Sequence, residues 1–278
     1  MILVIGAKGM LGKDLMELFA EQARGVDIED IDITDFESIR KTLLAVKPRI
    51  VINAAAYTDV DGCESDKDTA MAVNGEGAAF LAMVTAEIGA KFVQISTDYV
   101  FDGTKGEPYE EDDAPHPMSV YGESKYAGEL NAKMNPYHLV VRTQWLYGLH
   151  GKNFVETMLR LGAEKQEIGV VDDQTGSPTW TVDLARAIKS LLDKDCRGVY
   201  HAANSGFCTW NEFSRAIFSE AGMTVNVKPI TTEELGRPAP RPSYSTLDCG
   251  KLRHDTGMTL PIWSEALHNY LQARRKKD

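Results

Sequence analysis

Residues 6–12 read Gly6-Ala7-Lys8-Gly9-Met10-Leu11-Gly12 and directly follow the apolar segment Ile2–Ile5. The apolar segment is typical of a buried strand, and apolar residues recur at helical spacing after Met10. Glycines between a strand and a helix allow a sharp turn, let a pyrophosphate approach the backbone, and let the helix pack on the strand. The free N–H groups at the helix N-terminus favour an anion. This stretch therefore predicts a dinucleotide-binding unit.

Short apolar runs and helical patterns alternate through the rest of the first half. The predicted strands are Ile2–Ile5, Val26–Ile28, Arg49–Asn53, Phe92–Ile95 and His138–Arg142. The predicted helices are Met10–Ala23, Asp35–Val46, Ser65–Ile88 and Gly122–Met134. Near-continuous apolar strands that alternate with helices indicate a parallel sheet covered on both faces. We expect a Rossmann-type, doubly wound α/β fold.

The pattern loosens after Gly148. Further predicted elements are the helices Asn153–Leu161, Thr181–Leu192 and Trp210–Ala221 and the strand Gly198–Ala202. The Pro-rich segment Gly236–Pro242 is either a linker or a loop that closes on a ligand. We expect residues 1–150, with a return segment at about 178–205, to form the dinucleotide-binding domain. Residues 151–177 and 206–278 would form a smaller α/β substrate-binding lobe.

Composition indicates an ordinary globular chain of 278 residues, with 43% hydrophobic and 26% charged residues. The formal charge of −11 argues against nucleic-acid or acidic-membrane partners. The four cysteines lack metal-ligand spacing and suit a reducing compartment. We find no signal peptide and no apolar run of about 20 residues, so we expect a cytoplasmic protein without a membrane span.

A carboxylate near the end of the second strand would accept hydrogen bonds from the adenine ribose. Asp27 is our choice, and Asp30 and Asp32 compete with it because apolar and acidic residues alternate through this stretch. An acidic residue here favours NAD over NADP, because it would repel a 2′-phosphate. The nearby cations Lys8 and Arg24 weaken that inference.

Tyr121 and Lys125 form a Y-x-x-x-K pair, whose spacing puts both side chains on one helix face. An ordinary phenol, with a pKa of about 10, is a poor acid–base catalyst at neutral pH. A nearby cation favours the phenolate, so we expect Lys125 to lower the pKa of Tyr121. Lys125 could also bind the nicotinamide ribose.

Two more segments follow predicted strands, at the edge of a parallel sheet where ligands bind. Thr97, with Ser96 as the alternative, follows the fourth strand and could hydrogen-bond a substrate carbonyl. Asn53 and the small residues after it follow the third strand, where they would let the backbone approach the cofactor.

Together these features resemble the extended short-chain dehydrogenase/reductase superfamily. Within it the chain is similar to the dTDP-4-dehydrorhamnose reductase family from Met1 to about Trp263. The segments that carry this resemblance are NAAAYTDVD (53–61), STDYVF (96–101), YGESKYAG (121–128), RTQWLYG (142–148), NFVETMLRLG (153–162) and DQTGSPT (173–179).

The resemblance implies reduction of the C4 keto group of dTDP-4-dehydro-L-rhamnose with NADPH or NADH. It implies a catalytic set of Thr97, Tyr121 and Lys125. The implied cofactor positions are Gly6, Gly9, Met10, Leu11, Gly12, Asp32, Ile33, Ala54, Ala55, Ala56, Tyr57, Tyr121 and Lys125. The implied substrate positions are Thr97, Asp98, Tyr99, Tyr121 and Trp145, with Asp61, Phe101, Asn153 and Arg241 matched less securely.

Some of these positions also have a simpler structural interpretation. Trp145 follows the fifth strand and could stack on a sugar or base, or be a core residue. Arg241 could bind a diphosphate, or be a solvated loop charge. Tyr99 could be a packing residue. Some family members form dimers through magnesium bound to glutamates, but we cannot match that acidic set beyond Asp14 and Glu17 and predict no metal.

Two other functions stay open. Another nucleotide-sugar epimerase, 4-ketoreductase or dehydratase of the superfamily is the first alternative. A 4,6-dehydratase has Asp-Glu directly after its threonine, where this chain has Asp98-Tyr99. A non-catalytic NAD(P)-binding regulatory subunit, like that of methionine adenosyltransferase, is the second alternative; the intact Thr97, Tyr121 and Lys125 favour an enzyme. We expect a dTDP-sugar as the partner, and a monomer or homodimer.

Overall fold

The computed structural model describes residues 1–276, so the last two residues of the predicted lobe lie outside it. Six parallel strands form the central sheet in the order β10-β5-β4-β3-β1-β2. Their bounds are β1 Ile2–Ile5, β2 Ala23–Val26, β3 Ile50–Asn53, β4 Lys91–Thr97, β5 His138–Thr143 and β10 Gly198–His201. The fold class is therefore confirmed as a doubly wound, Rossmann-type α/β sheet.

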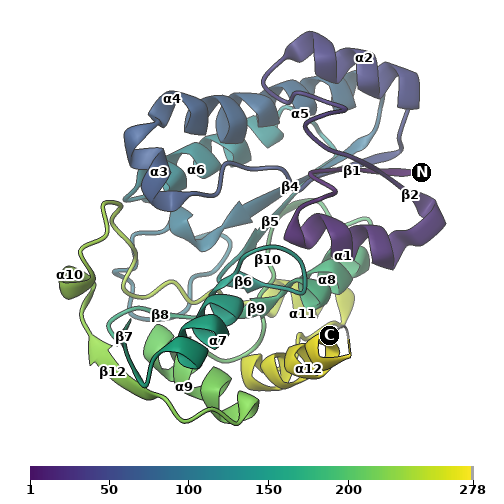
Figure 1. Ribbon diagram of the computed structural model, residues 1–278. Helices are drawn as coiled ribbons and strands as arrows, with labels where there is room; N and C mark the ends of the chain where they lie inside the picture. Colours follow the sequence, from purple (N-terminus) through teal and green to yellow (C-terminus); the bar gives the residue numbers. More distant parts are fainter. Residues whose placement is uncertain (277–278) are drawn as a thin grey trace.

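Helices cover both faces of this sheet (Figure 1). One face carries α1 (Met10–Phe19) and α8 (Thr181–Asp193), and the other carries α2 (Phe36–Val46), α5 (Gly77–Glu87) and α6 (Val120–Ala132). The side chains of β1 alternate between two apolar clusters: Ile2 and Val4 pack with α1 and α8, and Leu3 and Ile5 with α2 and α5. This alternation is why the whole strand is apolar.

A second body of helices and short strands packs beside the C-terminal edge of the sheet (Figure 1). It contains α7 Phe154–Glu164, β7 Glu167–Val171, β8 Thr175–Gly176, β11 Cys208–Thr209, α9 Trp210–Ala221, β12 Asn226–Ile230, α10 Thr232–Leu235 and α12 Trp263–Arg275. Except for β8 and α10, these elements share an apolar cluster of their own, which includes Phe213 and Tyr270. The remaining short elements are β6 Leu146–Tyr147, β9 Thr179–Trp180 and α11 Gly250–Thr256.

Several predicted elements, among them the second strand, the first helix and the long helix at 65–88, have different bounds in the structure. The second strand ends at Val26 and not at Ile28, which is 78% exposed in the turn that follows. The first helix ends at Phe19, and a 3₁₀ turn continues to Gln22. The long helix predicted at 65–88 is three pieces: α4 (Lys67–Ala70), a π-helical turn (Met71–Glu76) and α5. A short helix, α3 (Val60–Ser65), precedes them.

The strand order reverses direction between β1 and β3, since β2 lies on one side of β1 and all later strands on the other. Ligands of open parallel sheets bind at such a point, beyond the carboxyl ends of the strands. The glycine loop after β1 and residues 54–57 after β3 meet there.

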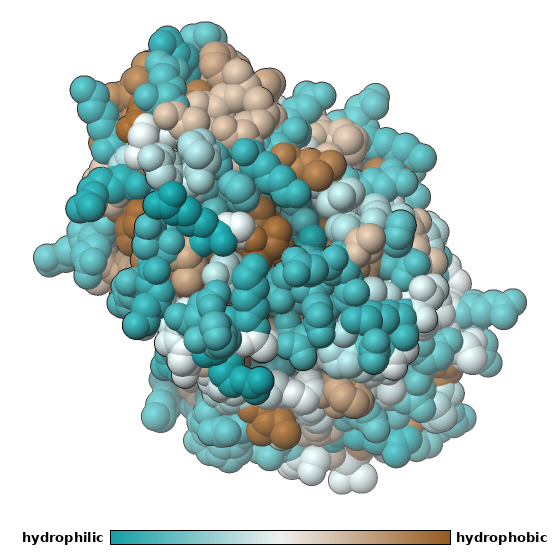
Figure 2. Space-filling view, turned by 180° about the vertical axis from the view of Figure 1, so that it is seen from behind, coloured by the Kyte–Doolittle hydropathy of each residue, from teal (hydrophilic) through white to brown (hydrophobic). Residues whose placement is uncertain are grey.

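Seen from behind, the surface is mostly hydrophilic and its hydrophobic residues form separate small patches (Figure 2). Within residues 1–276, no helix combines the length and the apolar character that a membrane span requires.

Candidate active site

The glycine loop packs so closely on the segment after β3 that side chains would not fit. Gly6 has a φ of +78°, and a Cβ there would lie 2.7 Å from the amide nitrogen of Ala55. A Cβ on Gly12 would collide with the carbonyl oxygen of Gly6. Gly9 precedes α1 as its N-cap and has no side chain to satisfy the first N–H groups. This cradle suits a pyrophosphate, which the free backbone donors would bind.

The other predicted loop residues differ in their role. Met10 begins α1 at the edge of the cradle, whereas Leu11 is 6% exposed and belongs to the core. The small residues Ala54, Ala55 and Ala56 are each partly exposed beside the cradle.

Asp27 is the carboxylate nearest the glycine loop. It directly follows β2, and its Oδ2 accepts a hydrogen bond of 2.7 Å from the backbone N–H of Lys8. Asp30 instead accepts the N–H of Asp27, and Asp32 accepts two bonds from Thr34 within its own turn. Of the three competing acids, the structure brings Asp27 to the loop. Ile33, predicted to lie behind the adenine, is 8% exposed.

Asn53 and Tyr57 are held by hydrogen bonds within the protein. The Asn53 amide donates to Gln94 over 2.9 Å, and its oxygen accepts the N–H of Ala55. Asn74, in the π-helical turn, bonds both backbone groups of Tyr57 and donates to Ser124 on α6. Asn74 therefore ties the cofactor segment to the helix of Tyr121. The sequence gives no signal for it, because its role depends on the wide π turn.

Thr97, Tyr121 and Lys125 lie on adjacent elements at the end of β4. Thr97 is the last residue of β4, and α6 carries Tyr121 and Lys125 one turn apart. Lys125 is 4% exposed, and its Nζ donates to the carbonyl of Ile95 over 2.7 Å. The Tyr121 ring meets the Tyr99 ring edge to face, with 5.5 Å between the centroids. Tyr99 is thus a packing partner of Tyr121.

Burial changes the pKa of both members of the Y-x-x-x-K pair. Burial, together with the charge of Asp98, holds the pKa of Tyr121 above its ordinary range, while the Thr97 side chain lowers it by hydrogen bonding. Burial also lowers the pKa of Lys125 to about 8. The predicted lowering of the Tyr121 pKa is therefore wrong for the protein without cofactor, because desolvation of the phenolate prevails. A protonated Tyr121 is the form that can donate a proton.

The hydroxyl of Ser96, the alternative to Thr97, is bound within the protein. It donates to Glu129 over 2.5 Å, and Glu129 also forms a buried bidentate ion pair with Arg142. Successive residues of a strand face opposite sides, so only Thr97 can serve the site.

Trp145 lies between β5 and β6, and another side chain covers one face of its indole ring. Its ring stacks on that of Trp210 from α9, with 3.5 Å between the centroids and 7° between the planes. Its backbone has a φ of +47°, which a bulky residue rarely adopts. A Cβ on Gly176 would lie 2.5 Å from the indole. The sequence did not identify Trp210, which fixes the plane of Trp145.

Asp61 anchors the Pro-rich segment to the first domain. Its carboxylate accepts from Arg241 over 3.1 Å, from Arg237 over 3.3 Å and from the N–H of Ala239 over 3.2 Å. Burial raises the pKa of Asp61, but the bonds from Arg241 and Ala239 outweigh burial, so the pKa lies below its usual range. The Arg241 guanidinium also acts to lower the pKa of Tyr99, although burial of the phenol prevails and raises it. The Pro-rich segment is therefore held against Asp61 by three hydrogen bonds.

Two predicted substrate residues have packing or capping contacts within the protein. Phe101 is 1% exposed and stacks on Tyr109, with Arg142 over its ring. Asn153 caps α7: its oxygen accepts the N–H of Glu156, and its amide donates to the carbonyl of Gly148. Packing and capping account for both residues.

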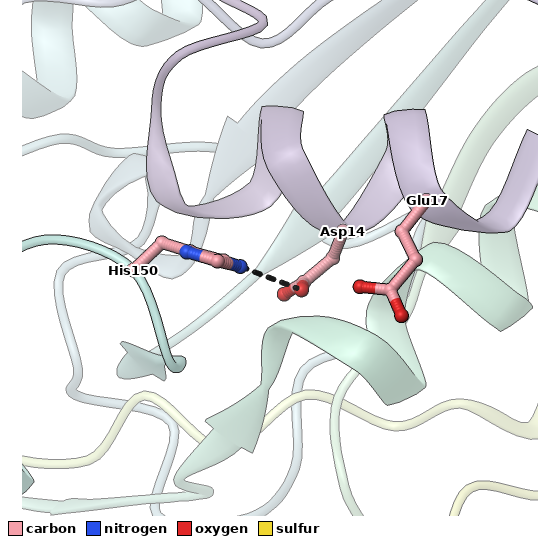
Figure 3. Close-up of side chains that lie close together, drawn as sticks. All are labelled: Asp14, Glu17 and His150. Carbon is pink, nitrogen blue, oxygen red and sulfur yellow. Dashed lines mark ion pairs between the residues drawn. The ribbon is translucent and has the colours of Figure 1, made fainter. Parts of the chain in front are cut away.

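Asp14 and Glu17 of α1 lie close to His150, which follows β6 (Figure 3). Their potential ligand atoms lie within 4.8 Å of one another, and His150 Nε2 lies 3.9 Å from Asp14 Oδ1. Asp14 and Glu17 are the two acids that the sequence analysis found on this helix. We assign no metal to them, because an acidic cluster alone does not define a metal site.

The parallel sheet, the glycine cradle and the Tyr121–Lys125 pair after β4 define an extended short-chain dehydrogenase/reductase. A family model described as RmlD substrate binding domain matches residues 1–276, and the chain belongs to this family.

Relatives match the chain along nearly its whole length. The spore coat polysaccharide biosynthesis protein SpsK of Bacillus subtilis is 43% identical, over 98% of this chain and 97% of its own. A dTDP-4-dehydrorhamnose reductase of Streptomyces griseus is 42% identical, over 95% of this chain and 91% of its own.

Solved structures are also similar to the chain over nearly its whole length. A dTDP-4-dehydrorhamnose reductase of Clostridium acetobutylicum superposes with a TM-score of 0.97, at 43% identity and 99% coverage of both chains. That of Bacillus anthracis, in complex with NADP, superposes with a TM-score of 0.96, at 43% identity and 98% coverage of both.

Proposed function

We propose that this chain is an NADPH- or NADH-dependent reductase that converts dTDP-4-dehydro-L-rhamnose to dTDP-L-rhamnose. The observation that carries the proposal is the constellation of Thr97, Tyr121 and Lys125 at the carboxyl end of β4, beside the glycine cradle. Relatives named for this reaction match the whole chain, including both bodies of the fold.

A dihydronicotinamide supplies a hydride when it is bound. Reduction of a ketone adds that hydride to the carbonyl carbon and one proton to the oxygen, which yields the alcohol. Tyr121 supplies the proton, because its raised pKa keeps the phenol protonated at neutral pH. Thr97 holds the oxygen beside Tyr121, and the Lys125 charge stabilises the phenolate that forms.

The remaining residues divide between cofactor and substrate. Asp27 would bind the adenine ribose, and residues 54–57 would line the nicotinamide side. Trp145, Tyr99 and Asp98 would contact the sugar nucleotide, and Arg241 its diphosphate. We infer residues 1–150 and about 178–205 as the cofactor domain, with the rest as the substrate lobe. We also infer a cytoplasmic monomer or homodimer.

The test is NADH and NADPH oxidation by the purified chain, with dTDP-4-dehydro-L-rhamnose and with UDP-linked 4-keto sugars. We expect oxidation that depends on the dTDP-sugar and yields dTDP-L-rhamnose. The Tyr121→Phe, Lys125→Met double variant is the matched control for background oxidation. No turnover with any 4-keto nucleotide sugar would overturn the proposal. Purified protein that carries stoichiometric, non-exchanging NAD would favour an epimerase instead.

A further inference from the structure

Gln174 forms hydrogen bonds to two segments of the second body at once. It follows β7 within the DQTGSPT segment (173–179) and is 5% exposed. Its Oε1 accepts a hydrogen bond of 3.2 Å from the indole N–H of Trp210 on α9. Its Nε2 donates over 2.9 Å to the hydroxyl of Thr232, the first residue of α10. One buried amide therefore joins α9 to the short helix that directly precedes the Pro-rich segment.

Donor and acceptor chemistry allows only one direction for this chain of hydrogen bonds. An indole nitrogen only donates, and a carboxylate only accepts. Asp173 accepts the backbone N–H of Thr232 over 2.9 Å and its hydroxyl over 2.6 Å. Because the Thr232 proton goes to Asp173, the Thr232 oxygen accepts from Gln174, and the Gln174 carbonyl faces Trp210. Glutamine satisfies both ends of this position, whereas an ionised glutamate would have no proton for Thr232.

Trp210 in turn confines the indole of Trp145. The two rings stack with 3.5 Å between the centroids, and the Trp210 ring also meets that of Phe154 on α7 at 4.4 Å. The backbone of Gly176 packs against the same Trp145 indole, where a Cβ would lie 2.5 Å from Cε2. Apolar contacts have no preferred direction, whereas the N–H bond to Gln174 is directional and fixes how the Trp210 ring is turned. Gln174 therefore determines the plane against which Trp145 lies.

We propose that Gln174 is a positioning residue for the sugar nucleotide, which acts through Trp210 on Trp145 and through Thr232 on the segment that carries Arg241. This inference rests on the proposed reductase function, in which Trp145 and Arg241 contact the substrate. The φ of +47° at Trp145 is rare for a bulky residue, so its placement depends on the contacts around it. Loss of Gln174 should weaken substrate binding and leave the reacting groups on β4 and α6 in place.

The test is Gln174→Leu, which removes both hydrogen bonds and keeps a side chain of similar size. We expect KM for the dTDP-sugar to rise about 10-fold, the effect of roughly two neutral hydrogen bonds. The kcat should stay within about threefold of wild type, because the lost interaction contributes equally to substrate and transition-state binding. The Kd for NADH should not change.

A spectroscopic signal reports the Trp145–Trp210 stack without substrate. Stacked indoles give an exciton couplet in the circular dichroism spectrum, and Trp145→Phe, which removes one of the two indoles, identifies that couplet. We expect Gln174→Leu to reduce it, because the Trp210 ring is then free to turn. Gln174→Glu keeps the acceptor for Trp210 but loses the donor to Thr232. It should therefore retain the couplet and still raise KM, and Thr232→Val should do the same.

Asn211→Ala is the matched control for a general loosening of α9. Asn211 follows Trp210 in the chain, and its buried amide donates to the Val170 carbonyl of β7. Its loss should lower stability and leave KM and the couplet as in wild type. An unchanged KM or an unchanged couplet in Gln174→Leu would overturn the inference, as would an equal rise of KM in Asn211→Ala. An inactive wild type would defeat the proposed function instead, since the couplet still tests the link from Gln174 to Trp145.

Discussion

Asp61 and Arg241 form an ion pair of 3.1 Å that joins the first domain to the Pro-rich loop, although 180 residues separate them. Arg241 is 15% exposed and Asp61 21% exposed, so the pair is partly shielded from water. Arg241 also contacts Tyr99, whose ring packs on Tyr121. The Arg241 guanidinium therefore joins the Pro-rich loop to Asp61 and lies near Tyr99, the packing partner of the proposed proton donor.

Arg241→Lys should weaken binding of the dTDP-sugar more than binding of the cofactor. Lysine keeps the charge but loses the planar fork that binds two oxygens at once. We expect KM for the sugar nucleotide to rise roughly 10-fold, with KM for NADH unchanged. Arg237→Lys is the matched control, because Arg237 also pairs with Asp61 but is 58% exposed. Equal effects of the two substitutions on KM would contradict a diphosphate role for Arg241.

Asp27 should set the preference between the two cofactors. Its carboxylate lies against the N–H of Lys8 at the end of β2, where a ribose 2′-phosphate would be repelled. We expect Asp27→Ser to shift the ratio of kcat/KM for NADPH over NADH upward by about 10-fold or more. Asp30→Ser serves as the control, since Asp30 bonds the backbone of Asp27 and not the glycine loop. The same shift in Asp30→Ser would contradict a specific role of Asp27 in the cofactor preference.

The buried Asp98 should make stability depend on pH in an unusual direction. Its pKa is raised from 3.8 to about 6, so the folded state holds a proton that the unfolded chain has already lost. The free energy of unfolding should therefore fall as pH rises from about 4 to about 6, by on the order of 3 kcal/mol from this group. Asp98→Asn should lack this part of the pH dependence. Urea unfolding of the wild type and of Asp98→Asn across this pH range measures the dependence. An equal change in the free energy of unfolding with pH in both proteins would contradict the prediction.

Lys125 should cause a loss of activity at alkaline pH. Burial lowers its pKa to about 8, so its positive charge disappears as pH rises through that value. We expect kcat/KM, which reports ionisations of the free enzyme, to decline above about pH 8. Lys125→Met should be less active and lack this limb, because the group that titrates is gone. A flat profile between about pH 7 and pH 9 for wild type would show that the charge of Lys125 is not needed.

Local patterns predicted the elements whose signal is contained in a few residues. The glycine loop, the alternating strands and the helix of Tyr121 and Lys125 are of this kind. The end of β2 was misplaced because the alternation of acidic and apolar residues after Val26 imitates a strand, whereas Ile28 lies in an exposed turn. The π turn with Asn74 was not predicted, because it depends on tertiary packing and no local spacing of residues indicates it.

The residues of the candidate site likewise divide into those that a local pattern indicates and those that depend on tertiary contacts. Thr97, Tyr121 and Lys125 were predicted from their place after β4 and their spacing on one helix. Trp210 was not, since its stacking partner Trp145 is more than 60 positions away in the chain. The lowered pKa of Tyr121 was wrong because a helix pattern does not report how deeply a phenol is buried.

The most direct test of the proposed reaction is single-turnover oxidation of NADH by Tyr121→Phe with dTDP-4-dehydro-L-rhamnose, compared with wild type. Phenylalanine keeps the ring that packs on Tyr99 but cannot donate a proton. We predict that the rate of the chemical step falls by about 10²-fold or more, the size of a general-acid contribution, while the Kd for NADH changes little. An unchanged rate in Tyr121→Phe would contradict the assignment of Tyr121 as the proton donor.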